Sequence, residues 1–188
     1  MTQYIAFIRG INAGLRMKMS DLRQLFDDAG FQNTQTVLAT GNVIFGADDD
    51  REQVARRIER AFDQLYNYKT IAILYTKQEL QALLEAEPFK GMVKTTEASQ
   101  QVSFVSKQVE LPFALPYDRS EKGYTILQKI GNVLCSTVDI SGKKRPDIIA
   151  VLDRIFDGKV TTRNWQTVER CYKAMDSSKH NQANLSAR

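Results

Sequence analysis

The stretch "TQTVLATGNVIFG", residues 34–46, decides the fold. Both of its halves are rich in residues that favour β-strands, and the Gly41-Asn42 pair between them is typical of a tight hairpin turn. The stretch therefore predicts two antiparallel strands joined without a helix. The elements on either side of this hairpin then decide the class of sheet.

A helix is predicted on each side of the hairpin. The segment "SDLRQLFDDAG", residues 20–30, offers Ser20 as an N-cap, apolar residues at helical spacing and Gly30 as a stop. After the hairpin, residues 48–50 are all aspartates, which favour the start of a second helix. Strands predicted at 3–9 and 70–76 complete the order β-α-β-β-α-β, which is the ferredoxin-like unit.

The second half of the chain repeats this order less regularly. A strand is predicted at 100–107, a hairpin turning at Gly131-Asn132, and a helix over 145–158. We therefore predict an α+β protein made of two ferredoxin-like (βαββαβ) subdomains in tandem, the second irregular. The predicted boundaries are 1–76 for the first subdomain, 77–176 for the second and 177–188 for a flexible tail.

The residue counts exclude several chemistries. The chain has one histidine and two cysteines in 188 residues. His180 lies in the predicted tail, so a Ser-His-Asp triad or a Cys-His pair has no suitable base. Cys135 and Cys171 are far apart and predict buried free thiols. A closed zinc site lacks ligands, and we predict no metal and no cofactor.

Composition also bounds the location and the partners. No run approaches the roughly 20 apolar residues of a membrane span, and the N-terminus reads as a strand, not a signal peptide. We expect a cytoplasmic protein without a membrane partner. The net charge of +4 indicates a mild preference for anions. The oligomeric state does not follow from the sequence.

The stretch "TTRNW", residues 161–165, precedes a run with helical periodicity. Trp165 shares that periodicity, which favours a core anchor over an exposed stacking platform. Thr162 or Asn164 can cap the helix. Arg163 has two readings that the sequence leaves open: it binds an anion at the helix start, or it pairs with a local carboxylate.

A basic turn, Lys143 to Arg145, stands before the predicted helix at 145–158. It is not a phosphate-binding P-loop, because the first glycine and the hydroxyl residue after lysine are absent. A solvated turn is one interpretation. An anion held at the helix N-terminus is the other.

Four stretches together resemble one family. They are "RGINAG" with the helix behind it, "ATGNVIF", the basic turn before "IIAVLDRIFDGKV", and "TTRNWQTV". In this order, from about residue 2 to 175, they resemble the bacterial domain of unknown function 1697. The resemblance implies an α+β fold of two ferredoxin-like subdomains and implies no established activity.

The matching stretches fall at a strand end, a hairpin turn and two helix starts, and loops carry function more often than framework does. The family likeness motivates a hypothesis of one ligand site. Its members are Arg9, Asn12, Asn42, Lys143, Arg163 and Asn164.

The sequence is compatible with three functions. The first is a binding module for a phosphate-bearing ligand, either a nucleotide or a nucleic acid. The second is a metal-independent enzyme in which Arg and Lys stabilise a developing anion and an Asp or Glu acts as base. The third is a structural or interaction protein. The sequence therefore leaves undecided whether the chain is an enzyme.

Overall fold

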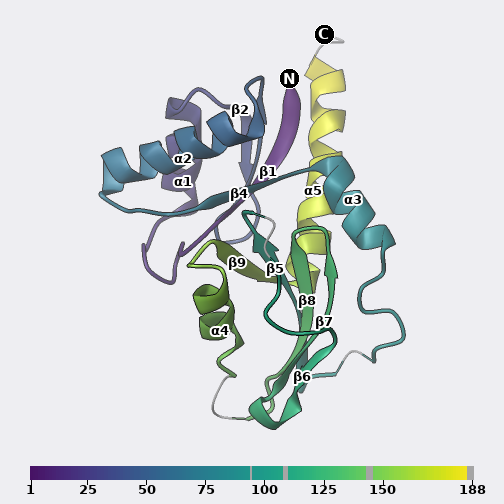
Figure 1. The fold of residues 1–188 in the computed structure, drawn as a ribbon. Helices are drawn as coiled ribbons and strands as arrows, with labels where there is room; N and C mark the ends of the chain where they lie inside the picture. The colour runs from purple at the N-terminus through teal and green to yellow at the C-terminus, as the bar shows by residue number, and fades with distance from the viewer. Residues whose placement is uncertain (94, 108–109, 143–145, 186–188) are drawn as a thin grey trace. The chain divides into compact units, whose positions relative to one another are not determined.

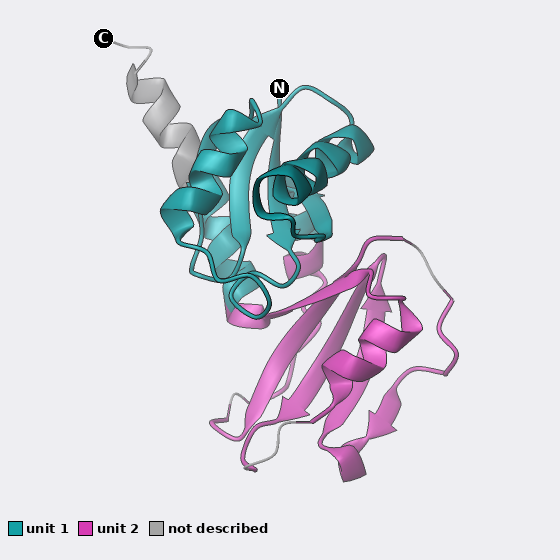
Figure 2. Ribbon diagram, turned by 90° about the vertical axis from the view of Figure 1, so that its left-hand side faces the viewer, with its two compact units in different colours: residues 1–82, 167–188 teal, residues 83–166 magenta. Residues whose placement is uncertain are grey.

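The computed structural model describes residues 1–93, 95–107, 110–142 and 146–185, with side chains described as far as Asp176. The described residues form a mixed α+β fold with two antiparallel sheets and five α-helices (Figure 1). They divide into two compact units, residues 1–82 with 167–188 and residues 83–166 (Figure 2). The predicted flexible tail, 177–188, falls on residues whose side chains lie outside the described part, and it stays a prediction.

These units differ from the sequence-based boundaries in two places. The first unit extends beyond residue 76 to residue 82, and residues 167–176 group with it rather than with the second unit. The sequence pattern shows a helix over this last segment, but it does not show which sheet the helix joins.

Unit 1 contains the first sheet and four helices or parts of helices. Its elements in chain order are β1 (Thr2–Ile8), α1 (Met19–Asp28), β2 (Gln32–Thr36), β3 (Asn42–Ala47), α2 (Arg51–Tyr66), β4 (Ala72–Thr76), most of α3 (Lys77–Glu85) and α5 (Trp165–Leu185) from residue 167 onward. The strand order is β2-β3-β1-β4, with every pair antiparallel. The hairpin predicted from residues 34–46 is therefore confirmed. Its connection is residues 37–41 rather than Gly41-Asn42: Gly41, with a φ of 71°, ends the connection, and Asn42 begins β3.

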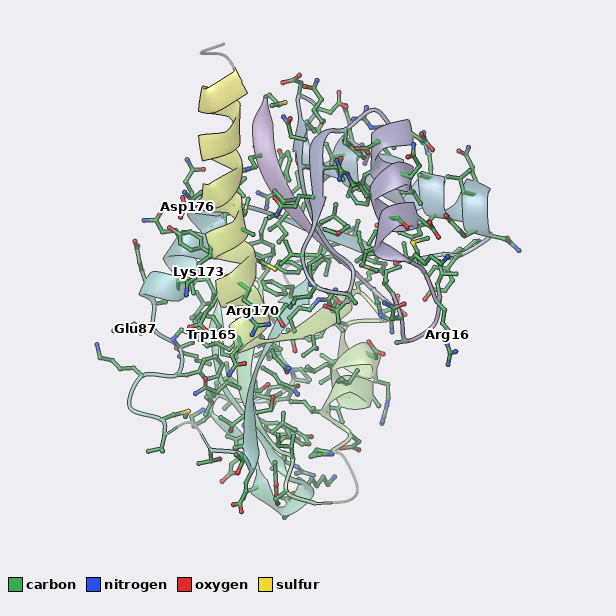
Figure 3. The ribbon with its side chains drawn as sticks, turned by 180° about the vertical axis from the view of Figure 1, so that it is seen from behind. Arg16, Glu87, Trp165, Arg170, Lys173 and Asp176 are labelled. Carbon is green, nitrogen blue, oxygen red and sulfur yellow. The ribbon has the colours of Figure 1, made fainter. Side chains whose placement is uncertain are left out.

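Helices cover both faces of the first sheet. α1 and α2 lie on one face and α3 and α5 on the other (Figures 1 and 3). The core under α1 and α2 is rich in aromatic rings, with Phe26, Phe31 and Phe45 in mutual contact. On the opposite face Phe7 and Tyr75 are buried and their ring centroids are 6.2 Å apart. The strand aromatics are thus all buried, and the sheet offers no exposed rings for stacking RNA bases.

The described residues of unit 2 contain the second sheet, one complete α-helix and a short 3-10 helix. Its elements are β5 (Ala98–Val105), β6 (Tyr117–Arg119), the short 3-10 helix η1 (Ser120–Lys122), β7 (Tyr124–Ile130), β8 (Val133–Asp139), α4 (Ile148–Ile155) and β9 (Val160–Asn164). The strand order is β6-β7-β8-β5-β9. The order β7-β8-β5-β9 repeats that of the first sheet, but β6 and η1 take the place of a helix after β5. The irregular connection follows from "PFALPYDRSEKG", which carries two prolines and no helical period.

Two helix starts differ in how they are capped. The second helix starts after the aspartates, as predicted, and Asp50 caps it: its carboxylate accepts a hydrogen bond of 2.9 Å from the Gln53 amide. Ser20 does not cap α1, which begins earlier, at Met19, with Lys18 in the N-cap position and no side-chain cap. The Ser20 hydroxyl instead donates to Asp21. The first turn of α1 therefore has no side-chain cap; its Asp21 amide donates to the Lys18 carbonyl at 3.1 Å, and the Asp21 carboxylate stands in the same turn.

The start of α3 is a capping box that the sequence analysis did not predict. The Glu79 carboxylate accepts a 2.7 Å hydrogen bond from the Thr76 amide, and the Thr76 hydroxyl accepts one of 3.3 Å from the Glu79 amide. Arg51 forms an ion pair of 2.6 Å with the same carboxylate. Burial raises the pKa of Glu79, but these hydrogen bonds outweigh it and hold the pKa below its usual value.

Removing this charge is expected to destabilise the protein in a pH-dependent way. A lowered folded-state pKa stabilises the fold above the unfolded value, about 4.3, and this contribution is lost as the pH falls through the folded value. Glu79→Gln should therefore lower the free energy of unfolding by about 1 kcal/mol at pH 7. Below about pH 4 the variant and the wild type should have the same free energy of unfolding. Urea unfolding at both pH values measures this. Glu52→Gln, on an exposed carboxylate, is the control, and a difference that stays constant with pH would contradict the account.

Candidate functional site

Three loops meet at one end of the first sheet, and hydrogen bonds tie them together. They are residues 9–18 after β1, residues 37–41 between β2 and β3, and residues 67–71 before β4. The Arg9 amide donates to the Ile71 carbonyl at 3.0 Å, and the Thr70 hydroxyl donates to the Arg9 carbonyl at 2.7 Å. The Ile8 amide donates to the Gly41 carbonyl at 2.8 Å. The loops therefore form one connected surface.

Asn12 and Asn42 hold these loops in place. The Asn12 side chain donates to the Ala39 carbonyl and accepts from the Met17 amide at 3.2 Å. Asn42 is fully buried, and its amide nitrogen donates to the Val37 carbonyl and the Thr40 hydroxyl, both at 2.9 Å. Asn12 also adopts a φ of 62°, which asparagine tolerates. Both amides thus serve the loop backbone; Asn42 is closed off from solvent, whereas the Asn12 side chain is exposed.

Two glycines bring Tyr68 against the first loop. A Cβ atom at Gly10 or Gly14 would collide with the Tyr68 hydroxyl. That hydroxyl donates to the Gly10 carbonyl at 3.4 Å. Because the backbone approaches the ring so closely, the segment before β4 packs on the loop after β1.

The same three loops carry four cations and no carboxylate. We call Arg9, Arg16, Lys18 and Lys69 the basic loop cluster. Arg16, Lys18 and Lys69 are exposed, and Arg16 projects away from the loop (Figure 3). None of these three has an ion-pair partner among the residues that the structure describes. Lys18 also occupies the uncapped N-terminus of α1.

The arrangement suits an anion with more than one charge. Backbone amides at a helix N-terminus attract negative charge, and unpaired arginine and lysine side chains add to that attraction. Their positive charge is exposed, so the interaction is screened by salt. Of this cluster, only Arg9 was among the predicted site residues. Lys69 was missed, because no local signal shows that its loop joins the loop after β1.

The "TTRNW" stretch belongs to unit 2, and its polar side chains form hydrogen bonds within the second sheet. Arg163 donates to the Thr161 hydroxyl at 2.7 Å and to the Thr162 carbonyl at 2.9 Å, so part of its guanidinium is engaged within its own strand. The Thr162 and Ser103 hydroxyls share a 2.8 Å hydrogen bond, and the side-chain Oδ1 of Asn164 accepts one of 3.2 Å from the Ser99 hydroxyl. Neither Thr162 nor Asn164 caps α5 with its side chain among the described residues. Their polar atoms bond across the sheet instead.

Trp165 is buried at the start of α5, with 8% of its surface exposed. Its ring meets Phe89 edge-on, with centroids 5.3 Å apart. This confirms Trp165 as a packed anchor. Trp165 also lines a pocket of about 260 Å³, together with residues of β5, β8 and β9.

The predicted six-residue site is distributed over both units. Arg9, Asn12 and Asn42 belong to unit 1, whereas Arg163 and Asn164 belong to unit 2. Lys143 lies outside the described residues. The convergence of these residues on one site stays a prediction. Beside the basic turn, a pocket of about 470 Å³ has Glu121, Lys122, Asp139 and Asp147 among its described lining residues.

The remaining reactive groups do not form a catalytic arrangement in the described residues. Both cysteines are buried and free, as predicted, and burial raises the pKa of the Cys135 thiol to about 12. Burial likewise raises the pKa of Glu59, whose carboxylate accepts a 3.1 Å hydrogen bond from the Ala72 amide at the start of β4. No described group of three or more His, Cys, Asp or Glu residues is placed to hold a metal ion.

The fold defines an α+β protein, and the loops at one end of its first sheet carry four cations. The chain belongs to the family described as protein of unknown function (DUF1697), which matches residues 1–134. The match ends before the "TTRNW" stretch. None of the curated proteins matches the chain.

A solved structure shares the fold. It is the conserved bacterial protein SP0830 from Streptococcus pneumoniae, with a TM-score of 0.71 and 20% sequence identity. The similarity covers 94% of this chain and 99% of that one. No helix in the described parts of the chain is long and apolar enough to cross a membrane.

Proposed function

We propose that this protein is a binding module for a phosphate-bearing ligand, a nucleotide or a nucleic acid, and that the basic loop cluster contacts the phosphates. The observation that carries the proposal is the charge of the three loops: four cations, no carboxylate, and three side chains with no ion-pair partner in the described residues. The first turn of α1, which has no side-chain cap, adds backbone donors beside Lys18.

The proposal gives the predicted site residues different roles. Arg9 belongs to the basic loop cluster, and its backbone anchors the loop to Thr70. Asn12 and Asn42 position the loops rather than touch the ligand. We take each sheet as one ferredoxin-like unit, the second irregular, because both contain the same order of four strands.

The enzyme alternative gains no support from the described groups. It required a carboxylate with a raised pKa inside a pocket beside Arg163. Glu59 has a raised pKa, but it belongs to unit 1, bonds to the Ala72 amide and lines neither described pocket. A binding function is therefore the better account.

The test is binding of a labelled single-stranded oligonucleotide at several salt concentrations, with ATP and inorganic triphosphate as competitors. Each phosphate contact to a single strand contributes about −0.7 to the slope of log K against log salt. Arg16→Ala with Lys18→Ala should weaken binding several-fold and reduce the slope by about 1.4. Competition by ATP at low concentration would identify a nucleotide as the preferred ligand.

The control removes the same charge from unit 2. Lys122 and Arg154 are exposed and lie in η1 and α4, so Lys122→Ala with Arg154→Ala leaves the basic loop cluster intact. Equal losses in the two double variants would show a general charge effect and would refute the proposed site.

A further inference from the structure

Exposed apolar side chains lie beside the basic loop cluster. Among the described side chains of unit 1, the large hydrophobic ones that remain exposed are Met1, Leu38, Leu65 and Tyr66. Leu38 lies in the loop between β2 and β3. Leu65 and Tyr66 end α2, directly before the loop that carries Lys69. Single exposed apolar residues are ordinary on protein surfaces, but three of them at the cationic end of one sheet offer a ligand apolar surface as well as positive charge.

The loop after β1 stands between these apolar groups. β1 lies between β3 and β4 in the sheet, so its loop has the β2–β3 loop on one side and the loop before β4 on the other. Both sides are in close contact: a Cβ atom at Gly41 would lie 2.9 Å from the Ile11 side chain, and one at Gly14 would lie 2.5 Å from the Tyr68 hydroxyl. Three of the four cations of the basic loop cluster belong to this middle loop. Positive charge is therefore flanked by apolar side chains on both sides.

Leu38 is fixed in a strained conformation. Its φ of 58° lies in the left-handed region, which leucine rarely adopts. The residue after it is held because Asn12 donates to the Ala39 carbonyl. The residue before it is held because Asn42 donates to the Val37 carbonyl at 2.9 Å. The loop thus presents Leu38 with 41% of its surface exposed, and strain that neighbouring contacts hold in place is typical of ligand-contacting positions.

Tyr66 continues the inner row of α2 beyond the buried core. The fully buried members of this row follow one another at intervals of four residues, and they are Val54, Ile58 and Phe62. Tyr66 is the next position on the same helix face. Its ring centroid is 6.4 Å from that of Phe62, yet 38% of the residue is exposed. The ring is therefore held against the core and still offers surface to a ligand.

An aromatic ring beside several cations suits a single nucleic-acid strand. Proteins bind such strands with positive side chains along the phosphates and with aromatic side chains that stack on the bases. The cations of the loops are exposed, and each exposed charge contributes little because water and salt screen it. A strand carries one phosphate per nucleotide and reaches several of these cations at once, whereas a free nucleotide places its phosphates at one point.

From these observations we infer that the ligand of the basic loop cluster is a single-stranded nucleic acid. Its phosphates follow the loop after β1, one base stacks on Tyr66, and another nucleotide contacts Leu38. The inference rests on the proposed phosphate-binding function and adds to it the class of ligand and the two apolar contacts. An abasic strand separates the two claims, because it has the phosphates and lacks the bases.

The test compares a labelled oligothymidylate with an abasic strand of the same length, by fluorescence anisotropy at low salt. The strand with bases should bind about tenfold more tightly. Equal affinities for the two strands would overturn this inference and leave the phosphate-binding proposal standing, whereas binding of neither strand would refute both.

Two competitors test the class of ligand. ATP that displaces the strand as effectively as unlabelled oligothymidylate, at equal phosphate concentration, would overturn the inference in favour of a free nucleotide. Vesicles of anionic phosphatidylglycerol should compete less well than the unlabelled strand. Tighter binding to the vesicles would assign the surface to a membrane and would also overturn the inference.

Substitutions at Tyr66 assign the stacking contact. Tyr66→Leu keeps an apolar side chain against Phe62 and removes the ring, so affinity for the oligothymidylate should fall about tenfold, with no change for the abasic strand. Tyr66→Phe keeps the ring and should retain affinity within about twofold. Tyr117→Leu is the matched control in unit 2, where the ring also lies beside a cation, Arg119, and it should leave binding unchanged. A loss in Tyr66→Leu that is equal for the two strands would contradict the stacking contact.

A variant on the other side of the middle loop tests the second contact. Asparagine tolerates a positive φ better than leucine does, so Leu38→Asn should raise the melting temperature while it weakens oligothymidylate binding several-fold. The higher melting temperature would show that the loop is intact, so the lost affinity could not come from unfolding. Unchanged affinity in this variant would contradict the contact at Leu38.

Discussion

Replacing Phe45 with alanine is expected to destabilise the protein by about 3–5 kcal/mol. Phe45 is fully buried in the core under α1 and α2. Its ring centroid lies 4.7 Å from that of Phe31, 5.1 Å from that of Phe26 and 6.0 Å from that of Tyr4. Truncation removes three aromatic contacts at once and leaves a cavity that these rings cannot fill without leaving their own positions.

Urea unfolding of two control variants separates this effect from general sensitivity to mutation. Phe45→Leu keeps an apolar side chain at the site and should cost less than about 1.5 kcal/mol. Phe113→Ala removes a half-buried ring that stacks on Tyr117 in unit 2, and it should cost less than Phe45→Ala. A free energy of unfolding for Phe45→Ala within about 1 kcal/mol of wild type would show that the aromatic core is not closely packed.

The second large effect is expected at Asn42. Asn42→Ala removes the donor that satisfies the Val37 carbonyl inside the hairpin, along with the bond to the Thr40 hydroxyl. A buried carbonyl left without a partner costs about 1–3 kcal/mol. Because Asn42 is fully buried, water cannot easily replace the lost donor. We expect a loss of about 2 kcal/mol in the free energy of unfolding.

Matched substitutions test whether the donor is the cause. Asn42→Asp keeps the shape but removes the NH2 group, so it should destabilise at least as much as Asn42→Ala. Thr40→Ala removes only the exposed acceptor and should cost clearly less. A mild effect of Asn42→Asp would contradict the role that we assign to this amide.

The sequence predicted the elements whose signals are local. The two Gly-Asn pairs indicated both hairpins, although Asn42 itself begins β3, and the aspartates at 48–50 predicted the start of α2. These signals act over a few residues. The same local reasoning failed at Ser20. Ser20 was predicted as the N-cap, yet α1 begins at Met19 and leaves Lys18 in that position.

The candidate site depends on contacts that are distant in the chain. Tyr68 and Thr70 reach Gly10 and Arg9 across about 60 residues, and nothing near Lys69 indicates that its loop joins the loop after β1. Strand pairing likewise sets Gln100 opposite Thr137 and Gln101 opposite Asn164. No motif marks such residues, since their register is set by the sheet as a whole.

The structure also redirects the interpretation of the two asparagines. Asn12 and Asn42 were predicted as ligand contacts, and in the structure their amides bond to the loop backbone. This is the usual role of asparagine in turns. The exposed cations of these loops are Arg16, Lys18 and Lys69, which is why the functional proposal rests on them together with Arg9.

The phosphate-binding proposal is tested most directly by locating the site in solution. Inorganic triphosphate is titrated into the 15N-labelled protein, and the backbone amide resonances are followed residue by residue. The proposal predicts saturable shifts concentrated in residues 9–20 and 67–70, with the largest at the first turn of α1. Saturable shifts confined to other parts of the chain, or no saturable shift at low salt, would contradict it.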